Sequence, residues 1–272
     1  MKRFRVLLLL ACLSLVSVVK AEIKMTPDHT AHSTPGNSKS NSAQQWEVKA
    51  PAGSEMDLKE DKLLYFGTAE SPVTLTSAEN SFKLTARQVV YYRGREMFFA
   101  QGKVVIDGED PGTPSQRFVV SGEEVIYLVG RGELELPQGG TVQNPQGDTL
   151  RASRILIFLD TDSATQEIKS FEASGGFELA GERGRLTGDA LRGDNRQGLL
   201  EATGDIYFQS NDNGLSGTAE KAVYSEELKE VHLLGEPLLY QGEDYITGEK
   251  IIYHLEIEQV KVIGPVKARL CR

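Results

Sequence analysis

From Trp46 onward, short apolar stretches alternate with polar residues along most of the chain. Clear examples are Phe177-Glu178-Leu179, Ile206-Tyr207-Phe208 and Val260-Lys261-Val262. An alternation of period two places successive side chains on opposite faces of a strand, so it predicts β-structure. The 27 glycines suit many tight turns, and the sequence has no sustained helical stripe with caps. The pattern therefore predicts an all-β fold of repeated antiparallel strands.

A six-residue phrase recurs in this region: a small residue, two mostly polar residues, an apolar residue, any residue, and usually tyrosine. Clear copies occupy residues 86–91, 122–127, 219–224 and 248–253. Weaker copies occupy 152–157 and 188–193, the latter with Gly193 in place of the tyrosine. Repetition of this kind is typical of folds in which each unit shares its apolar face with the next.

A second phrase follows each copy of the first: a glycine, one further residue and an apolar strand. It begins at Gly102, Gly132, Gly175, Gly204, Gly235 and Gly264. The interval from the small residue to this glycine is 16 residues in four units, and 10 and 23 in the others. We interpret each unit as strand, turn and strand, in which the small residue permits close packing or a bend. Stacked units would bury a common apolar face and leave an unpaired edge strand at each end.

The N-terminal residues 1–21 are predicted to be a cleavable export signal. Basic residues at positions 2, 3 and 5 precede the apolar run Val6–Val19. Val19-Lys20-Ala21 then supplies the small residues that a signal peptidase requires. Residues 22–45 are rich in polar residues, proline and glycine, so we expect a flexible linker before a domain spanning 46–272.

Two alternatives to a cleaved signal remain. An uncleaved membrane anchor would need about 20 apolar residues, which is longer than the run Val6–Val19. A lipoprotein would be cut before Cys12, which follows Leu9-Leu10-Ala11, but few apolar residues precede that position. We expect a periplasmic location by cleavage and rank both alternatives below it.

Charge and cysteine content narrow the function classes. Removal of residues 1–21 takes away four basic residues and no acidic one, so the formal charge changes from −9 to −13. A nucleic-acid-binding protein needs a basic face, so we expect no nucleic-acid partner. Cys12 and Cys271 are the two cysteines, and loss of Cys12 with the signal would leave no internal disulfide. The fold would then depend on its apolar core.

The repeated phrases resemble the OstA-like family of periplasmic lipopolysaccharide transport proteins, which includes LptA-type and LptC-type members. The resemblance covers roughly Pro72 to Arg269, and three stretches carry it most clearly. They are Leu215-Ser216-Gly217 to Tyr224, Val231 to Pro237, and Ile246-Thr247-Gly248 to Tyr253 ending in Val262-Ile263-Gly264-Pro265-Val266.

The resemblance implies an open, V-shaped β-jellyroll whose seam holds the acyl chains of lipopolysaccharide. It also implies end-to-end pairing of terminal strands, either with other Lpt-type components or head to tail between copies. The family carries no catalytic residues and no cofactor. The long repeat region and the polar linker depart from a minimal member, so a bridge component and an LptC-type anchored component both remain open.

The candidate acyl-chain groove consists of the apolar residues expected to face inward. These are Val89, Tyr91, Val104, Ile106, Val125, Tyr127, Ile155, Ile157, Phe177, Leu179, Ile206, Phe208, Leu238, Tyr240, Ile251 and Tyr253. For any one of them, an ordinary packed core position is the simpler interpretation, because apolar residues are buried by default. The hypothesis concerns the set, since a lipid groove is mostly apolar with few polar groups.

Catalytic and metal-binding patterns are weak in this sequence. His29 and His32 form an isolated pair in the polar linker, and solvated linker residues are the preferred interpretation over a metal site. His232 and His254 lie in alternating strands, and no nucleophile elbow, HExxH or P-loop motif occurs. We therefore predict a non-enzymatic lipid carrier. A β-solenoid polysaccharide-active enzyme or adhesin is the alternative from another class.

Overall fold

The computed structural model describes residues 46–77, 82–110, 113–159, 168–211, 214–257 and 259–270, without the side chains of 109–117. Every strand pairing among them is antiparallel, and no described segment is an α-helix. The prediction of an all-β fold with antiparallel strands is confirmed. A parallel β-solenoid, in contrast, would require parallel pairing between successive coils.

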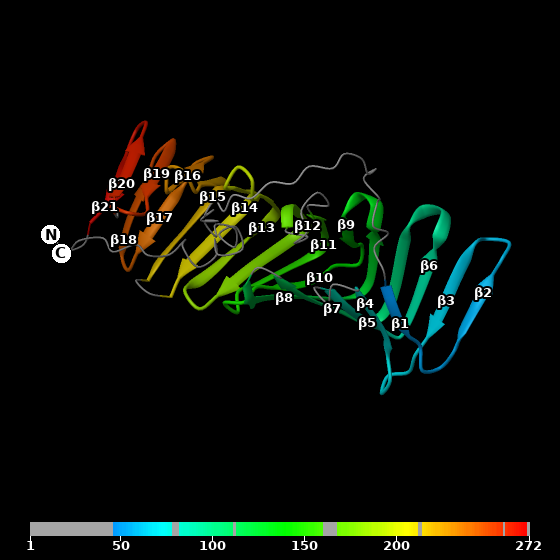
Figure 1. Cartoon of the computed structure of the whole chain (residues 1–272). Helices are drawn as coiled ribbons and strands as arrows, with labels where there is room; N and C mark the ends of the chain where they lie inside the picture. The colour runs from blue at the N-terminus through cyan, green and yellow to red at the C-terminus, as the bar shows by residue number, and fades with distance from the viewer. Residues whose placement is uncertain are drawn as a thin grey trace, which may run out of the picture.

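The chain forms one antiparallel meander that is folded lengthwise into two facing walls (Figure 1). Seven long strands run through both walls: β7 (Met97–Asp110), β8 (Thr113–Leu128), β11 (Thr149–Leu159), β12 (Ile168–Gly181), β13 (Gly184–Asp194), β14 (Leu199–Ser210) and β15 (Leu215–Ser225). Elsewhere the meander crosses the two walls as two short strands, one in each wall, which are separated at the bend. For example, β16 (Glu230–Leu234) and β17 (Leu238–Gln241) both pair with β15.

The short strands complete the walls on both sides of the long ones. Wall 1 contains β1 (Trp46–Lys49), β4 (Val73–Ser77), β5 (Phe82–Ala86), β10 (Gly140–Gln143), β17 (Leu238–Gln241), β18 (Asp244–Thr247) and β21 (Lys267–Arg269). Wall 2 contains β2 (Ser54–Asp57), β3 (Lys62–Phe66), β6 (Gln88–Tyr92), β9 (Glu133–Leu136), β16 (Glu230–Leu234), β19 (Lys250–His254) and β20 (Gln259–Ile263). Two 3-10 turns, η1 (Arg93–Arg95) and η2 (Val129–Arg131), lie at the margin of wall 2.

The recurrent glycine of the second phrase produces the bend between the walls. In β7, Gly102 and Lys103 both have positive φ, at 81° and 51°, and the register with β8 shifts between Gln101 and Val104. Gly204 and Asp205 in β14 repeat this arrangement, with φ of 75° and 40°. Two left-handed residues form a β-bulge that turns the strand, and glycine adopts that conformation without steric cost.

The small residue of the first phrase lies on the inner side of this bend. A Cβ at Gly188 would stand 2.6 Å from Cδ1 of Ile206 and 2.9 Å from the carbonyl oxygen of Gly204. The 16 residues between the two phrases therefore form one hairpin of wall 2. The chain leaves the bend, reaches the margin of wall 2, turns and comes back to the bend. Between Ala152 and Gly175 the interval is 23, because the connection between β11 and β12 is longer.

One unit departs from this arrangement. Gly132 follows η2 at the margin of wall 2, where it caps the turn with φ of 62°. The bend of that unit lies at Gly139, between β9 and β10. Both glycines have positive φ, so the sequence pattern does not separate a marginal turn from a bend.

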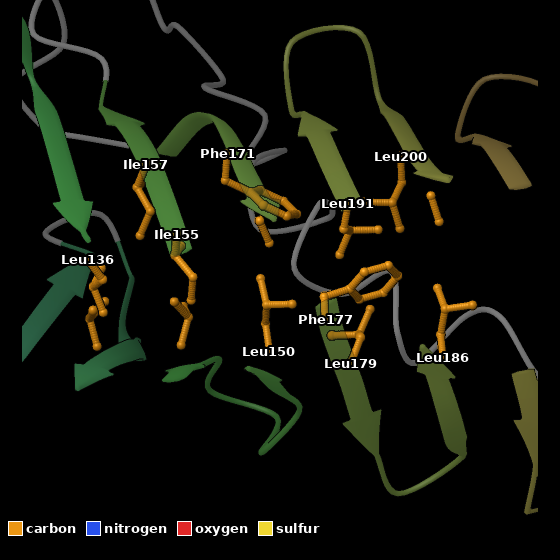
Figure 2. Packing of buried hydrophobic residues seen from close by; sticks show 14 of the residues in the cluster. Leu136, Leu150, Ile155, Ile157, Phe171, Phe177, Leu179, Leu186, Leu191 and Leu200 are labelled. Atoms are coloured by element: carbon orange, nitrogen blue, oxygen red, sulfur yellow. The ribbon is translucent and has the colours of Figure 1, made fainter. Parts of the chain in front are cut away.

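The core fills the space between the walls over most of their length. Residues from β4 through β19 form one continuous buried apolar cluster. Figure 2 shows Ile157, Phe171, Leu191 and Leu200 on one side of this space. Leu150, Phe177, Leu179 and Leu186 extend toward them from the other side. The two walls therefore stabilise each other by burying a common apolar face.

Candidate functional site between the two walls

Fourteen of the sixteen predicted groove residues face the space between the walls. Thirteen of them are buried, and Tyr91 is half-buried against the same cluster. Val89, Ile106, Ile155, Leu179 and Ile251 are fully shielded from solvent, with 0% exposure. The structure thus brings these residues together, and in this state they are packed against one another as a core.

Leu238 and Tyr240 were predicted to face inward, and this prediction is wrong. Tyr240 is 40% exposed and Leu238 is half-buried, whereas Leu239 between them is 4% exposed. The reason lies at Gly235-Glu236-Pro237. Pro237 is itself buried at the second position after the glycine, where Val104 and Ile206 stand in other units. The next inward residue is therefore Leu239, which the predicted register placed on the outer face.

The interior opens at the C-terminal end of the molecule. A cavity of about 300 Å³ lies between the last strands of both walls. Leu239, Tyr245 and Ile246 of wall 1 line it, together with Val260 of wall 2 and Leu270. Leu270 is 73% exposed, so the apolar lining continues to the surface. Figure 1 shows β20 and β21 at this end of the meander.

The N-terminal end of the interior is closed by aromatic side chains. The ring of Trp46 lies 5.6 Å from Phe82, 5.4 Å from Phe98 and 6.2 Å from Tyr127, in edge-on geometry. Phe82 in turn stacks on Tyr127 at 5.6 Å. Burial raises the pKa of Tyr127 to about 12, because the phenolate would be shielded from water.

The outer face of wall 2 carries charged side chains that are exposed to solvent. Arg154 pairs with Glu135 at 2.7 Å, and Lys221 pairs with Glu201 at 2.9 Å. Arg154, Arg192 and Glu201 line a cavity of about 280 Å³, and each of them forms an ion pair with a residue of a neighbouring strand. Such exposed pairs contribute little to stability, on the order of 1 kcal/mol or less. Charge therefore sits outside the walls and apolar surface sits between them.

The two strand histidines contact one glutamate, which the sequence pattern did not reveal. Nε2 of His232 lies 2.6 Å from Glu230, and Nδ1 of His254 lies 3.0 Å from the other carboxylate oxygen. The hydrogen bond with His232 is the main reason that the pKa of Glu230 lies below its ordinary value. The sequence missed this cluster because Glu230 and His254 meet only through the pairing of β16 with β19.

Several predictions fall on residues outside the described ranges. These include the export signal at 1–21, the linker at 22–45 with His29 and His32, and the cysteines Cys12 and Cys271. Within the described ranges, no group of three His, Cys, Asp or Glu side chains is arranged to hold a metal ion. No helix long and apolar enough to cross a membrane occurs there either.

Comparison with known proteins finds similarity over part of the chain. Residues 138–259 match the family described as LptA/(LptD N-terminal domain) LPS transport protein. Among solved structures, the chain is similar to LptH of Pseudomonas aeruginosa, described as the LptA-homologous periplasmic component of a lipopolysaccharide transport device. The identity is 14%, the TM-score is 0.39, and the match covers 47% of this chain and 96% of LptH. No curated protein matches the chain in sequence. Residues 138–259 of the chain are therefore similar to a family of lipopolysaccharide transport proteins.

Proposed function

We propose that this protein is a periplasmic component of the lipopolysaccharide bridge and that it holds acyl chains between its two walls. The observation that carries the proposal is the continuous apolar interior, which runs over most of the length of the meander and opens at the C-terminal end. Acyl chains leave water for such a surface at about 0.8 kcal/mol per buried methylene. The sugars and phosphates would remain outside, next to the hydrated faces.

Binding would require the walls to separate, because the interior side chains are closely packed in this state. The bulges at Gly102 and Gly204 supply hinges for that movement, since each lies where a strand passes from one wall to the other. The cavity beside Leu239 and Val260 is the natural entry, because it already connects the interior with the surface. The core side chains would then contact acyl chains while still pointing into the space between the walls.

The two ends of the meander offer edges for assembly with other components. β1 and β2 are the edge strands at one end, and β20 and β21 are the edge strands at the other. An edge strand presents unpaired backbone groups that can add a strand from another protein. Pairing with other Lpt-type components, or head to tail between copies, would join the interiors into one path for the lipid.

An LptC-type anchored component of the same pathway is the second candidate. It would keep the apolar run Val6–Val19 as a membrane anchor instead of losing it on export. Mass spectrometry of the N-terminus in membrane and periplasmic fractions separates the two candidates. A mature N-terminus at Glu22 supports the bridge component, and an intact Met1 in the inner membrane supports the anchored one.

The interior site can be tested with a photocrosslinking amino acid at neighbouring positions of one strand. Phe208 is 5% exposed and faces the interior, whereas its neighbour Tyr207 is 39% exposed and faces outward. We expect lipopolysaccharide adducts in cells from position 208, and from Tyr253 nearer the C-terminal opening, at least about tenfold above position 207. Equal labelling at 207 and 208, or no adducts at 208 and 253 in folded protein, would contradict the proposal.

A further inference from the structure

The first strand of the structure is weakly attached to the rest of the sheet. β1 has four residues, and its described pairing is with β4 alone. Its outward side chains, Glu47 and Lys49, are exposed and form an ion pair with each other at 3.4 Å. Its inward side chains, Trp46 and Val48, are half-buried. Most of what holds β1 in place is therefore one four-residue ladder and the contacts of Trp46.

Trp46 joins the free margins of the two walls. It pairs in register with Ser77, the last residue of β4 in wall 1. Its ring contacts Phe98 and Tyr127, which pair with each other in wall 2 next to the ends of β7 and β8. The margins lie farthest from the bend, so Trp46 closes the mouth of the V at this end.

Aromatic rings surround the indole of Trp46, and one buried hydroxyl group lies nearby at the margin of wall 1. Phe82 and Tyr127 stack beneath the indole, and Tyr91 stacks on Phe98 at 4.5 Å. The Ser77 hydroxyl is buried and has no hydrogen-bond partner among the described residues. Burial of an unsatisfied hydroxyl is unfavourable, and a ligand with a polar substituent would relieve that cost.

We propose that β1 is a displaceable strap, and that release of Trp46 opens a site for a long alkyl chain at the N-terminal end of the interior. This inference rests on the proposed function, because it assigns acyl chains to the interior. It adds that the N-terminal part of the interior is gated by a segment of the chain itself.

At the opposite end of the meander, the described residues form no such closure. The last strands, β20 and β21, leave the 300 Å³ cavity open, and Leu270 beside it is exposed. Two ends of one interior therefore differ, one sealed by an indole and the other accessible. Lipid would enter freely at the open end and reach the N-terminal end only after β1 moves.

A reversible disulfide tests the strap in a single protein. Glu47 and Thr76 are directly paired across β1 and β4, and both face away from the interior. The double variant Glu47→Cys/Thr76→Cys, with Cys12 and Cys271 replaced by serine, locks β1 on oxidation and frees it on reduction. Thr85→Cys/Val105→Cys is the matched control, because it staples β5 to β7 on the same outer face and neither residue pairs with β1.

Two readouts follow the strap and the lipid separately. Trp46 is the single tryptophan, so its emission and its quenching by acrylamide report β1 directly. Photocrosslinkers at position 98 and at position 208 report lipid at the N-terminal end and in the middle of the interior. Purified lipopolysaccharide is the probe.

In the reduced lock variant, lipopolysaccharide should increase acrylamide quenching of Trp46 and give adducts at 98 and 208. Oxidation of the lock variant should abolish the change in quenching and lower the adducts at position 98 at least tenfold, while the adducts at position 208 persist. Oxidation of the control variant should have neither effect. Unchanged adducts at 98 in the oxidised lock, with adducts at 208 present, would overturn the strap and leave the proposed function standing. Loss of adducts at both positions in the reduced, folded protein would overturn both.

Discussion

The side chain of Asp189 lies over Gly204, fifteen residues farther along the chain, so closely that a Cβ at Gly204 would stand 2.1 Å from its carboxylate. The same relationship joins Arg87 to Gly102, Glu220 to Gly235 and Glu249 to Gly264. In each pair the first residue directly follows the small residue of one phrase, and the second begins the next phrase. A line of such pairs runs along the bend and fixes where each strand turns from wall to wall.

Substitution at this line should destabilise the protein. Gly204 has φ of 75°, and an alanine there would be strained by its backbone as well as crowded by Asp189. We expect Gly204→Ala to lower the free energy of unfolding by about 1–3 kcal/mol. Gly94→Ala is the control, because its Cβ would meet nothing within 4 Å and its φ is not in the left-handed region. Equal midpoints in urea unfolding for the two variants would contradict this account of the bend.

The two phrases that mark this bend could be recognised in the sequence because their signals are local. A bulge needs glycine at one position, and close packing needs a small residue at another, so both leave a trace at a fixed interval. The alternation of apolar and polar residues likewise predicted the strands and most inward positions. All of these features depend on neighbours within one or two strands.

The register of β17 was not readable in the same way. Proline stands at position 237, where other units have an aliphatic residue. The first aliphatic residue after the glycine is then Leu238, so the alternation of apolar and polar residues suggests a shift of one position. A shift of one residue moves every side chain of a strand to the opposite face. Leu238 and Tyr240 were therefore assigned to the interior in place of Leu239.

The corrected register predicts that the same substitution has different effects on stability at two adjacent leucines. Leu239→Asp would bury a carboxylate among apolar side chains at a position that is 4% exposed. We expect it to destabilise the protein by several kcal/mol or to prevent folding. Leu238→Asp places the same group on a half-exposed face and should cost about 1 kcal/mol or less. Soluble yield and thermal midpoints measure the difference, and a larger loss at Leu238 would restore the original register.

Other features were out of reach because they depend on contacts between distant segments. Trp46 meets Tyr127 only after four further passes of the meander are in place. Glu230 meets His254 through the pairing of β16 with β19, and the pattern within each strand gives no sign of it. Sequence periodicity identifies which face a residue occupies, but it does not identify the residue that lies opposite.

The inner face of wall 1 contains a row of three leucines across adjacent strands. Leu179 pairs in register with Leu150 on one side and with Leu186 on the other, and it is 0% exposed. Leu179→Ala should lower the free energy of unfolding by about 2–5 kcal/mol, because a cavity replaces the packed side chain. Val105→Ala is the control at a position 38% exposed, where about 0.5 kcal/mol is expected. Denaturant unfolding measures both, and a loss below about 1 kcal/mol at Leu179 would mean that the walls readjust around the gap.

The Glu230 cluster predicts a pH dependence of stability. The pKa of Glu230 lies below its ordinary value of 4.5, chiefly because of the hydrogen bond with His232, with a further contribution from His254. A carboxyl whose pKa is lowered by folding stabilises the native state above its unfolded pKa. That stabilisation is lost as the pH falls through the lowered, folded pKa, when both states become protonated. We therefore expect Glu230→Gln to be less stable than the wild type at pH 7. The difference should shrink below about pH 4.5 and vanish at lower pH.

Urea unfolding midpoints from pH 3 to pH 7 measure this convergence, with Glu227→Gln in the exposed β15–β16 turn as the control. A difference that stays constant over the whole range would show that the substitution acts through packing and not through the charge of Glu230.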